Sequence, residues 1–461
     1  MRHARLLFIA ITALAACGAP GVRPATRPAS DGDEATAAQV RAELLHAWNG
    51  YKRYAWGHDA LRPLSRGHHD WYSTSLLMTP VDALDTLMLA GLAEEARQAR
   101  ELITARLSFD HDMEVRVFEV TIRLLGGLLS GYELSGDDRL LRLAEDLGRR
   151  LLPAFASPTG MPYQYVNLRS GKGRGARSNP AEVGTLLLEL GTLSRHTKNP
   201  VYGERAKRAL RALYARRSPL GLVGQELDVE TGRWTNPASH VGGAIDSYYE
   251  YLLKCALLFD DRECEQMWRE SLRAVNARVA DRTPAGLWYG RVDMTSGRRL
   301  ATRFGALEAF WPGLLALAGD VPHAAELQES CFRMWRVAGV EPEEIDYTTM
   351  RVVNARYPLR PEIIESAYYL HRATGRPRYR EMGRTFLADL RRHCRTADGY
   401  AALADVVTKR KADEMESFFL AETLKYLYLL FASSDRLDLE RVVLNTEAHP
   451  FRKHREPRTS R

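Results

Sequence analysis

The chain has 461 residues, of which 45% are hydrophobic and 27% are charged, and this composition excludes an intrinsically disordered protein. It is long enough for one large domain or for two to three ordinary ones. The 65 basic and 58 acidic residues leave a formal net charge of +7, part of which lies in a basic tail over residues 451–461, so a nucleic-acid-binding protein is disfavoured.

The N-terminal residues predict export and a lipid anchor. Arg2 and Arg5 precede an apolar run over residues 6–16, which is too short to span a membrane and is typical of a secretion signal covering residues 1–16. The run ends in Leu-Ala-Ala-Cys-Gly, which resembles the bacterial lipobox, a motif whose cysteine becomes lipidated. We therefore expect a lipid on Cys17 and an exported protein that is anchored to the bacterial cell envelope, periplasmic or at the cell surface. The alternative is a plain signal peptide with an incidental cysteine.

Residues 17–36 are rich in Pro, Ala, Asp and Gly without a periodic apolar pattern, which predicts a flexible tether after the lipidated cysteine. The folded part is expected over residues 37–450, and contact with a membrane only through the anchor. No pair of cysteines in it resembles a zinc ligand set. Four cysteines could form two disulfides in an exported protein, with a pairing that the spacing leaves open: Cys255, Cys264, Cys331 and Cys394.

One unit recurs seven times in the folded part: an apolar helix, a short polar turn and an amphipathic helix. The turns lie 45 to 62 residues apart and are centred on Gly91, Gly136, Lys198, Asp260, Gly319, Gly375 and Ser434. A helix that is apolar all round is buried, whereas an amphipathic helix lies at the surface. The repeat therefore predicts an all-α fold, a closed (α/α)7 barrel of seven inner and seven outer helices. An open solenoid uses the same unit, but it usually keeps a stricter period. A closed barrel of this size needs no partner for its core, so we expect a monomer.

Each turn follows an acidic residue by nine to seventeen positions, which places a carboxylate near the N-terminal end of each inner helix: Asp82, Glu119, Glu182, Asp246, Glu308, Glu362 and Glu422. Acids are favoured in the first turn of any helix, and this is the alternative explanation. Apolar and aromatic neighbours favour a functional site instead, as do same-face pairs such as Glu119 with Arg123 and Glu362 with Glu365. Carboxylates and aromatic rings at one mouth of a barrel suit acid–base catalysis, Ca²⁺ binding and sugar stacking, which together indicate glycoside hydrolysis.

At these residues the chain resembles glycoside hydrolase family 47, the class I α-mannosidases. Seven motifs carry the resemblance, in order between Leu45 and Pro450: residues 54–64 (YAWGHDALRPL), 81–87 (VDALDTL), 117–123 (VFEVTIR), 246–254 (DSYYEYLLK), 359–366 (LRPEIIES), 416–427 (ESFFLAETLKYL) and 445–450 (NTEAHP). The family's fold is an (α/α)7 barrel, in agreement with the repeat. Family members hydrolyse α-1,2-linked mannose with inversion and use Ca²⁺, so the resemblance implies a mannose-containing oligosaccharide or a glycoprotein glycan as substrate.

The resemblance also implies roles for individual residues. It assigns Glu119 as the general acid, acting through a water, and Glu362 as the base for the attacking water. Asp246 matches the active-site aspartate, Glu343 a further active-site acid, and Thr446 the calcium ligand. The residues that match the shell around the sugar, its waters and the calcium are Arg123, Glu182, Glu250, Arg360, Glu365, Glu422 and Glu447, with Phe418 as the ring beneath the sugar. Inversion requires acid and base carboxyl groups about 6.5 to 9.5 Å apart.

Three local features differ from the processing enzymes of the family. Ala244 stands where those enzymes have an arginine, so the resemblance leaves open how the subsites that recognise the branches of the glycan are built. Cys331 matches one half of a family disulfide whose other position is Ala309, so we expect no bridge there. Residues 305–313 are closer to the degradation-enhancing, mannosidase-like branch. The alternative function is a non-catalytic, lectin-like mannose-binding protein on the same barrel, but the presence of every matched acid favours catalysis.

Overall fold

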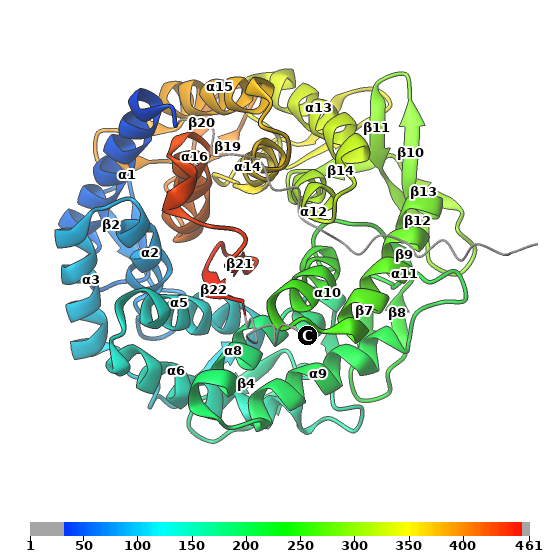
Figure 1. Ribbon diagram of the computed structural model, residues 1–461, viewed down its shortest axis with the longest axis horizontal. Helices are drawn as coiled ribbons and strands as arrows, with labels where there is room; N and C mark the ends of the chain where they lie inside the picture. Colours follow the sequence, from blue (N-terminus) through cyan, green and yellow to red (C-terminus); the bar gives the residue numbers. More distant parts are fainter. Residues whose placement is uncertain (1–31, 454–461) are drawn as a thin grey trace, which may run out of the picture.

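The computed structural model describes residues 32–453, and its helices form a closed ring of two layers (Figure 1). The inner layer consists of α2 (Met78–Leu89), α5 (Gly126–Ser135), α8 (Leu187–Thr197), α10 (Asp246–Phe259), α12 (Trp311–Leu317), α14 (Glu362–Thr374) and α16 (Leu424–Phe431). The outer layer consists of α1 (Glu34–Tyr54), α3 (Ala93–Arg106), α6 (Asp138–Leu151), α9 (Val201–Tyr214), α11 (Arg262–Arg278), α13 (Val321–Ala338) and α15 (Pro377–His393). The predicted (α/α)7 barrel is confirmed.

The first and last helices close the ring, which rules out the open solenoid. Helix α1 packs against α16, and α2 packs against the π-helical segment η4 (Phe419–Thr423) that precedes α16. The seventh outer helix is therefore the N-terminal one, whereas the repeat had placed it after the turn at Ser434. The chain after that turn instead forms a short 3₁₀ segment and a hairpin that enters the centre of the ring (Figure 1).

The barrel begins and ends slightly outside its predicted bounds of 37–450. Helix α1 already starts at Glu34, because the Asp33 side chain caps it by accepting a hydrogen bond from the Thr36 amide at 3.1 Å. At the other end, Arg452 still belongs to the last strand, and its amide donates to Glu133 Oε2 at 2.7 Å. The predicted signal peptide, Cys17, the tether up to residue 31 and the tail from residue 454 lie outside the described residues.

Burial follows the predicted division of the two layers. Every residue of α16 is buried, whereas the buried residues of α6 recur at helical spacing on one face: Leu140, Ala144, Leu147 and Leu151. Gly136 ends α5 with φ 71°, a conformation that glycine adopts without strain, and Asp137 then caps α6. The turns that the sequence marked therefore join inner to outer helices as expected.

Short antiparallel hairpins and three-stranded sheets make most of the connections from outer helices to the next inner helices. Their strands are β1 (Ala60–Arg62), β2 (Gly67–His69), β3 (Glu114–Arg116), β4 (Tyr165–Asn167), β5 (Gly173–Arg174), β6 (Arg177–Ser178), β7 (Glu226–Asp228), β8 (Trp234–Asn236), β9 (Ala238–Ser239), β10 (Ala280–Thr283), β11 (Gly286–Tyr289), β12 (Arg291–Asp293), β13 (Arg299–Ala301), β14 (Arg303–Gly305), β15 (Glu344–Asp346), β16 (Arg351–Asn354), β17 (Arg395–Thr396), β18 (Gly399–Tyr400), β19 (Leu403–Asp405), β20 (Arg410–Lys411), β21 (Val442–Leu444) and β22 (Pro450–Arg452). The remaining short helical segments are α4 (Val117–Glu119), η1 (Val120–Leu125), η2 (Leu152–Ala156), α7 (Pro180–Gly184), η3 (Leu307–Phe310) and η5 (Ser434–Arg436).

A disulfide joins Cys255 of α10 to Cys264 of α11, and Cys331 and Cys394 are buried free thiols. Of the four cysteines whose pairing was left open, two therefore form one disulfide and two remain reduced. Within residues 32–453, no helix has the length and apolar character needed to cross a bilayer.

Candidate active site

A cavity of about 280 Å³ opens where the N-terminal ends of the inner helices converge, and eight carboxyl groups and three arginines line it. The predicted site residues on its wall are Glu119, Arg123, Glu182, Asp246, Glu250, Arg360, Glu362, Glu365, Phe418, Glu422, Thr446 and Glu447. The structure thus brings together residues from both ends of the chain. Of the predicted site residues within the described range, Glu343 lies outside this wall and lines an adjoining cavity of about 230 Å³.

Two of the seven helix-terminal acids do not reach the main cavity, contrary to the prediction. Asp82 is fully buried beneath it, because His449 and Ser417 bind its carboxylate. Glu308 points into the adjoining cavity, where its Oε2 accepts a hydrogen bond from the Gly305 amide at 3.1 Å. The spacing places an acid on the correct turn of the helix but does not determine which partner the acid meets.

π-Helical turns position the acids at two points of the wall. Glu119 immediately precedes the π-helical segment η1, and Glu422 lies within η4. Such segments occur frequently at functional sites. In η1, Arg123 reaches back so that its Nε lies 3.1 Å from Glu119 Oε2, and its other end pairs with Glu447. The Glu119 side chain remains 18% exposed, so it can reach a ligand in the cavity.

Asp246 and Glu362 occupy the first positions of α10 and α14 and face the same cavity. Burial, assisted by the nearby Glu250, raises the pKa of Asp246 to about 6. Burial also raises the pKa of Glu362 to about 8, against the opposing influence of Arg360. Oε2 of Glu362 is buried without a protein hydrogen-bond partner. A buried carboxylate oxygen of this kind is available to a water or to a ligand.

The floor of the cavity, formed by Glu250, Glu365, Glu422, Thr446 and Glu447, has more carboxyl groups than basic groups. Lys254 pairs with Glu250, and Tyr426 donates to Glu365 Oε1 at 3.0 Å. Burial raises the pKa of Glu422 well above its usual range, and the neighbouring Glu447 adds to this effect. The floor therefore favours a cation or shared protons.

One side of the wall combines a cation with an aromatic ring. Arg360 binds Glu343 through two contacts, Nη2 to Oε1 at 2.6 Å and Nε to Oε2 at 3.2 Å, so Glu343 orients this guanidinium. The guanidinium groups of Arg360 and Arg123 lie 5.9 Å and 5.7 Å from the centre of the Phe418 ring. Phe418 therefore offers a flat apolar surface between two donors, an arrangement that suits a sugar ring.

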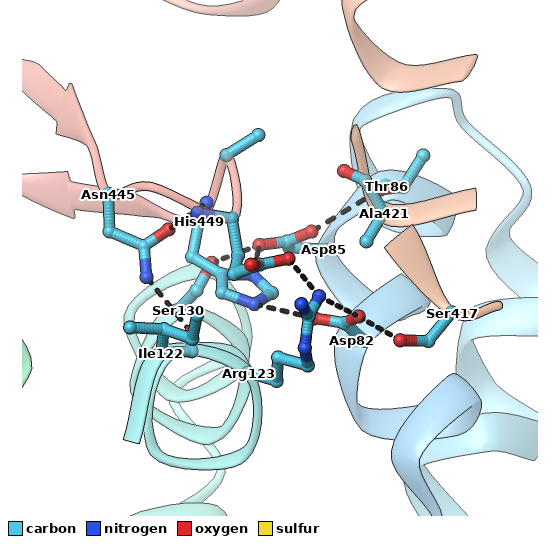
Figure 2. A network of polar contacts seen from close by, with 12 residues as sticks. Asp82, Asp85, Thr86, Ile122, Arg123, Ser130, Ser417, Ala421, Asn445 and His449 are labelled. Carbon is cyan, nitrogen blue, oxygen red and sulfur yellow. Dashed lines mark hydrogen bonds and ion pairs between the residues drawn. The ribbon is translucent and has the colours of Figure 1, made fainter. Parts of the chain in front are cut away.

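The hairpin of β21 and β22 brings Thr446 to the cavity, and Asn445 fixes its loop. Asn445 Oδ1 accepts from the amides of Glu447 and His449, and its Nδ2 donates to Glu189 Oε1 at 2.8 Å. The same Nδ2 donates to Ile122 O at 3.0 Å (Figure 2). Ala448 in this loop has φ 59°, a left-handed conformation that strains a non-glycine residue. The loop is thus held firmly in one conformation.

Beneath the loop, His449 lies between two buried aspartates (Figure 2). Its Nδ1 is 2.7 Å from Asp85 Oδ2, and its Nε2 is 3.1 Å from Asp82 Oδ1. Lys425 Nζ is 2.7 Å from the other oxygen of Asp85. Burial alone would lower the pKa of His449, but Asp85 and Asp82 overcome this effect and raise it to about 9. The protonated His449 ring therefore holds the hairpin of β21 and β22 against helix α2.

We expect the stability that His449 provides to depend on pH. Its pKa rises on folding from about 6.5 to about 9, so its contribution is complete below pH 6.5 and is lost as the pH rises through 9. The contribution of His449 to the free energy of unfolding therefore falls by about 3 kcal/mol between the low-pH and high-pH limits. Urea unfolding of wild type and His449→Gln at pH 6.5 and 9.5 measures it, and the gap between the two free energies of unfolding should narrow at the higher pH. A gap that is independent of pH would contradict an imidazolium here.

Several residues that support the cavity were not identified from the sequence. Arg116 lines it and binds Glu182, with Nε 2.9 Å from Oε1. Lys254 follows Glu250 by one helical turn, and this i, i+4 spacing could have revealed it. The Trp71 ring lies 5.3 Å from the Arg123 guanidinium, a contact between distant segments that no local pattern indicates.

The cavity lies at the mouth of an (α/α)7 barrel and contains several carboxyl groups in different environments. Beside them lie the Phe418 ring and the guanidinium groups of Arg123 and Arg360. Together these features define a glycoside hydrolase. The chain matches the family model described as glycosyl hydrolase family 47 over residues 43–453. The protein therefore belongs to glycosyl hydrolase family 47, the family that its motifs indicated.

Individual relatives agree with this placement. Alpha-mannosidase I MNS4 of Arabidopsis thaliana is 42% identical over 432 residues, which cover 89% of this chain and 68% of the relative. Mannosyl-oligosaccharide 1,2-alpha-mannosidase IA of Sus scrofa is 38% identical over 447 residues, which cover 90% and 67% of the two chains. The structure of alpha-1,2-mannosidase from Trichoderma reesei is similar with a TM-score of 0.86 and 28% identity, covering 92% of this chain and all of that one.

Proposed function

We propose that the protein hydrolyses α-1,2-linked mannose in mannose-containing oligosaccharides or glycoprotein glycans, with inversion of the anomeric carbon. The observation that carries the proposal is the convergence of Glu119, Asp246 and Glu362 on one cavity beside Phe418. The Arabidopsis relative is an alpha-mannosidase I, and the Sus scrofa and Trichoderma proteins are 1,2-alpha-mannosidases.

The residues divide the reaction between them. Glu119 gives a proton to the glycosidic oxygen through a water, and its contact with Arg123 keeps the carboxyl group aimed into the cavity. Glu362 takes a proton from the water that attacks the anomeric carbon, and its unpartnered Oε2 is the atom that accepts it. Asp246 lines the same cavity as Glu362, at the start of α10. Glu343 acts on the site through Arg360, which it holds in place.

The test is hydrolysis of an α-1,2-linked mannobiose by the purified protein, with the anomer of the first product followed by NMR. We expect β-mannose before mutarotation. Initial release of α-mannose would overturn the inverting mechanism, and binding of mannobiose without hydrolysis would favour the lectin-like alternative.

We propose further that the floor of the cavity binds Ca²⁺. Thr446 offers a hydroxyl and a carbonyl oxygen there, and the surrounding acids exceed the basic groups, a donor set that suits a hard cation. When bound, Ca²⁺ supplies a doubly charged centre that takes hydroxyl and water oxygens. Its charge also favours the ionised form of the Glu362 carboxylate, which that residue needs in order to act as a base.

Calcium removal should therefore abolish turnover. We expect a chelator to lower kcat at least tenfold and added Ca²⁺ to restore it. Thr446→Ala should raise the Ca²⁺ concentration for half-maximal activity by about 10- to 100-fold, while Thr446→Ser, which keeps the hydroxyl, should change it much less. Full activity of the wild type in chelator would contradict the proposal.

The cellular location that we propose is the bacterial envelope, with a monomeric enzyme held by a lipid on Cys17. The residues from 6 to 18 support this proposal through their signal and lipobox pattern. Cys17→Ser should move the enzyme from the membrane fraction to the soluble fraction. Retention of this variant in the membrane fraction would contradict the lipid anchor.

A further inference from the structure

A second cluster of metal-ligating side chains lies on the loop between α1 and α2, outside the cavity. We call His58, His68 and Asp70 the histidine cluster. One ligand atom of each lies within 4.8 Å of the other two. His58 Nδ1 is 2.9 Å from Asp70 Oδ2, and the rings of His58 and His68 are stacked with centres 3.4 Å apart and planes inclined by 14°.

The backbone around the histidine cluster is fixed by hydrogen bonds. His68 belongs to β2 and pairs with Leu61 of β1. The His58 carbonyl accepts from the Tyr51 hydroxyl at 2.7 Å, and Asp70 Oδ1 accepts from the Asp59 amide at 2.9 Å. The backbone positions of the three donor residues are therefore set before any ligand binds, which lowers the entropic cost of binding.

The cluster is open to solvent and its charges are not otherwise used. The side chains of His58 and Asp70 are 36% and 24% exposed, and His68 is exposed. Within residues 32–453, the ion pair of Asp70 is with His58. Imidazole binds a metal ion through a nitrogen lone pair, so any proton on a coordinating nitrogen is released when the ion binds.

We propose that the histidine cluster binds a late first-row divalent metal ion, with Zn²⁺ as the representative. Imidazole nitrogens suit Zn²⁺, Cu²⁺ and Ni²⁺, whereas Ca²⁺ and Mg²⁺ prefer oxygen ligands alone. Two imidazoles and one carboxylate leave a fourth position for water in a tetrahedral site. Ligand atoms around tetrahedral Zn²⁺ are about 3.3 Å apart. The exposed rings of His58 and His68 would therefore turn out of their parallel stack, so that a nitrogen lone pair of each is directed at the same ion. The proposal is independent of the hydrolytic function.

A bound ion would also restrain the neighbouring Trp71. The amide of Trp71 donates to Asp59 Oδ2 at 3.0 Å, and its indole donates to Glu416 Oε2 at 2.9 Å. Because Trp71 directly follows Asp70, an ion held by Asp70 would tie β2 to the segment that packs on Arg123. We therefore expect Zn²⁺ to raise the melting temperature of the protein.

The test is Zn²⁺ binding to the purified, untagged full chain by isothermal titration calorimetry. The protein is first stripped with chelator and then kept in millimolar Ca²⁺, so that the oxygen-rich cavity does not compete for Zn²⁺. We expect one zinc site that His58→Ala and His68→Ala each weaken at least tenfold. His69→Ala is the matched control, since His69 is also exposed and adjacent in β2 but is not part of the cluster.

Two further readouts secure the interpretation. The melting temperature in chelator should be the same for wild type and His68→Ala, which shows that the variant folds, and Zn²⁺ should raise it only in the wild type. Absence of zinc binding in the wild type would overturn the proposal. Equal affinity of wild type and His68→Ala would do the same, as would an equal loss in His69→Ala.

Discussion

Glu119→Gln is expected to lower kcat by about 10²- to 10⁴-fold, the usual contribution of a general acid. Glutamine keeps the length and the oxygen that Arg123 contacts at 3.1 Å, but it cannot supply the proton. Binding of mannobiose should therefore change little. Steady-state kinetics give kcat, and calorimetry gives the dissociation constant of a non-turned-over ligand such as mannose.

The matched control is Glu381→Gln, which removes a charge from an exposed site on α15. It should leave both kcat and binding unchanged. If Glu119→Gln retains a kcat within tenfold of wild type, Glu119 is not the acid. If binding is lost as well, its main role is to hold the substrate.

Asp85→Asn is expected to destabilise the fold by about 3 to 5 kcal/mol, because it leaves buried cations without their counter-charge. Asp85 is fully buried and is shared by Lys425 at 2.7 Å, His449 at 2.7 Å and the Ser130 hydroxyl at 2.7 Å. Lys425 and His449 together hold the pKa of Asp85 well below its usual range despite burial, so the carboxylate is charged across the physiological range. Urea unfolding at pH 7 measures the loss.

An exposed ion pair provides the comparison. Glu329→Gln breaks a contact with Arg378 whose two side chains are both more than 40% exposed, and it should cost less than about 1 kcal/mol. Similar losses in Asp85→Asn and Glu329→Gln would show that the buried network is not a principal source of stability.

Local patterns predicted the barrel well because its unit is local. The apolar helix, the turn and the amphipathic helix each follow from neighbouring residues, so the division between layers is confirmed. The assignment of α1 as the seventh outer helix was missed, because it depends on contact between α1 and α16 at opposite ends of the chain. The helix start at Glu34 was missed because the capping Asp33 lies in a stretch whose composition is typical of a tether.

The same distinction applies to the site. Of the twelve predicted residues that line the cavity wall, eleven lie in the motifs, and the twelfth, Glu182, was marked by the helical repeat. The position of Asp82 was wrong, because its partner His449 lies far along the chain and no spacing rule connects them. The link between Glu343 and Arg360 was missed for a similar reason, since the hairpin of β15 and β16 and a loop separate them.

The hairpin loop at Asn445–His449 has a consequence for the order in which the enzyme is made. Ribosomes synthesise this loop after all of the inner helices, and the loop carries Thr446 and Glu447 of the cavity floor. The inner helices can therefore be complete before these two residues are added. A nascent or prematurely terminated chain that ends before residue 445 would carry the acid and the base but lack Thr446 and Glu447, so that activity would appear only after the loop has been made.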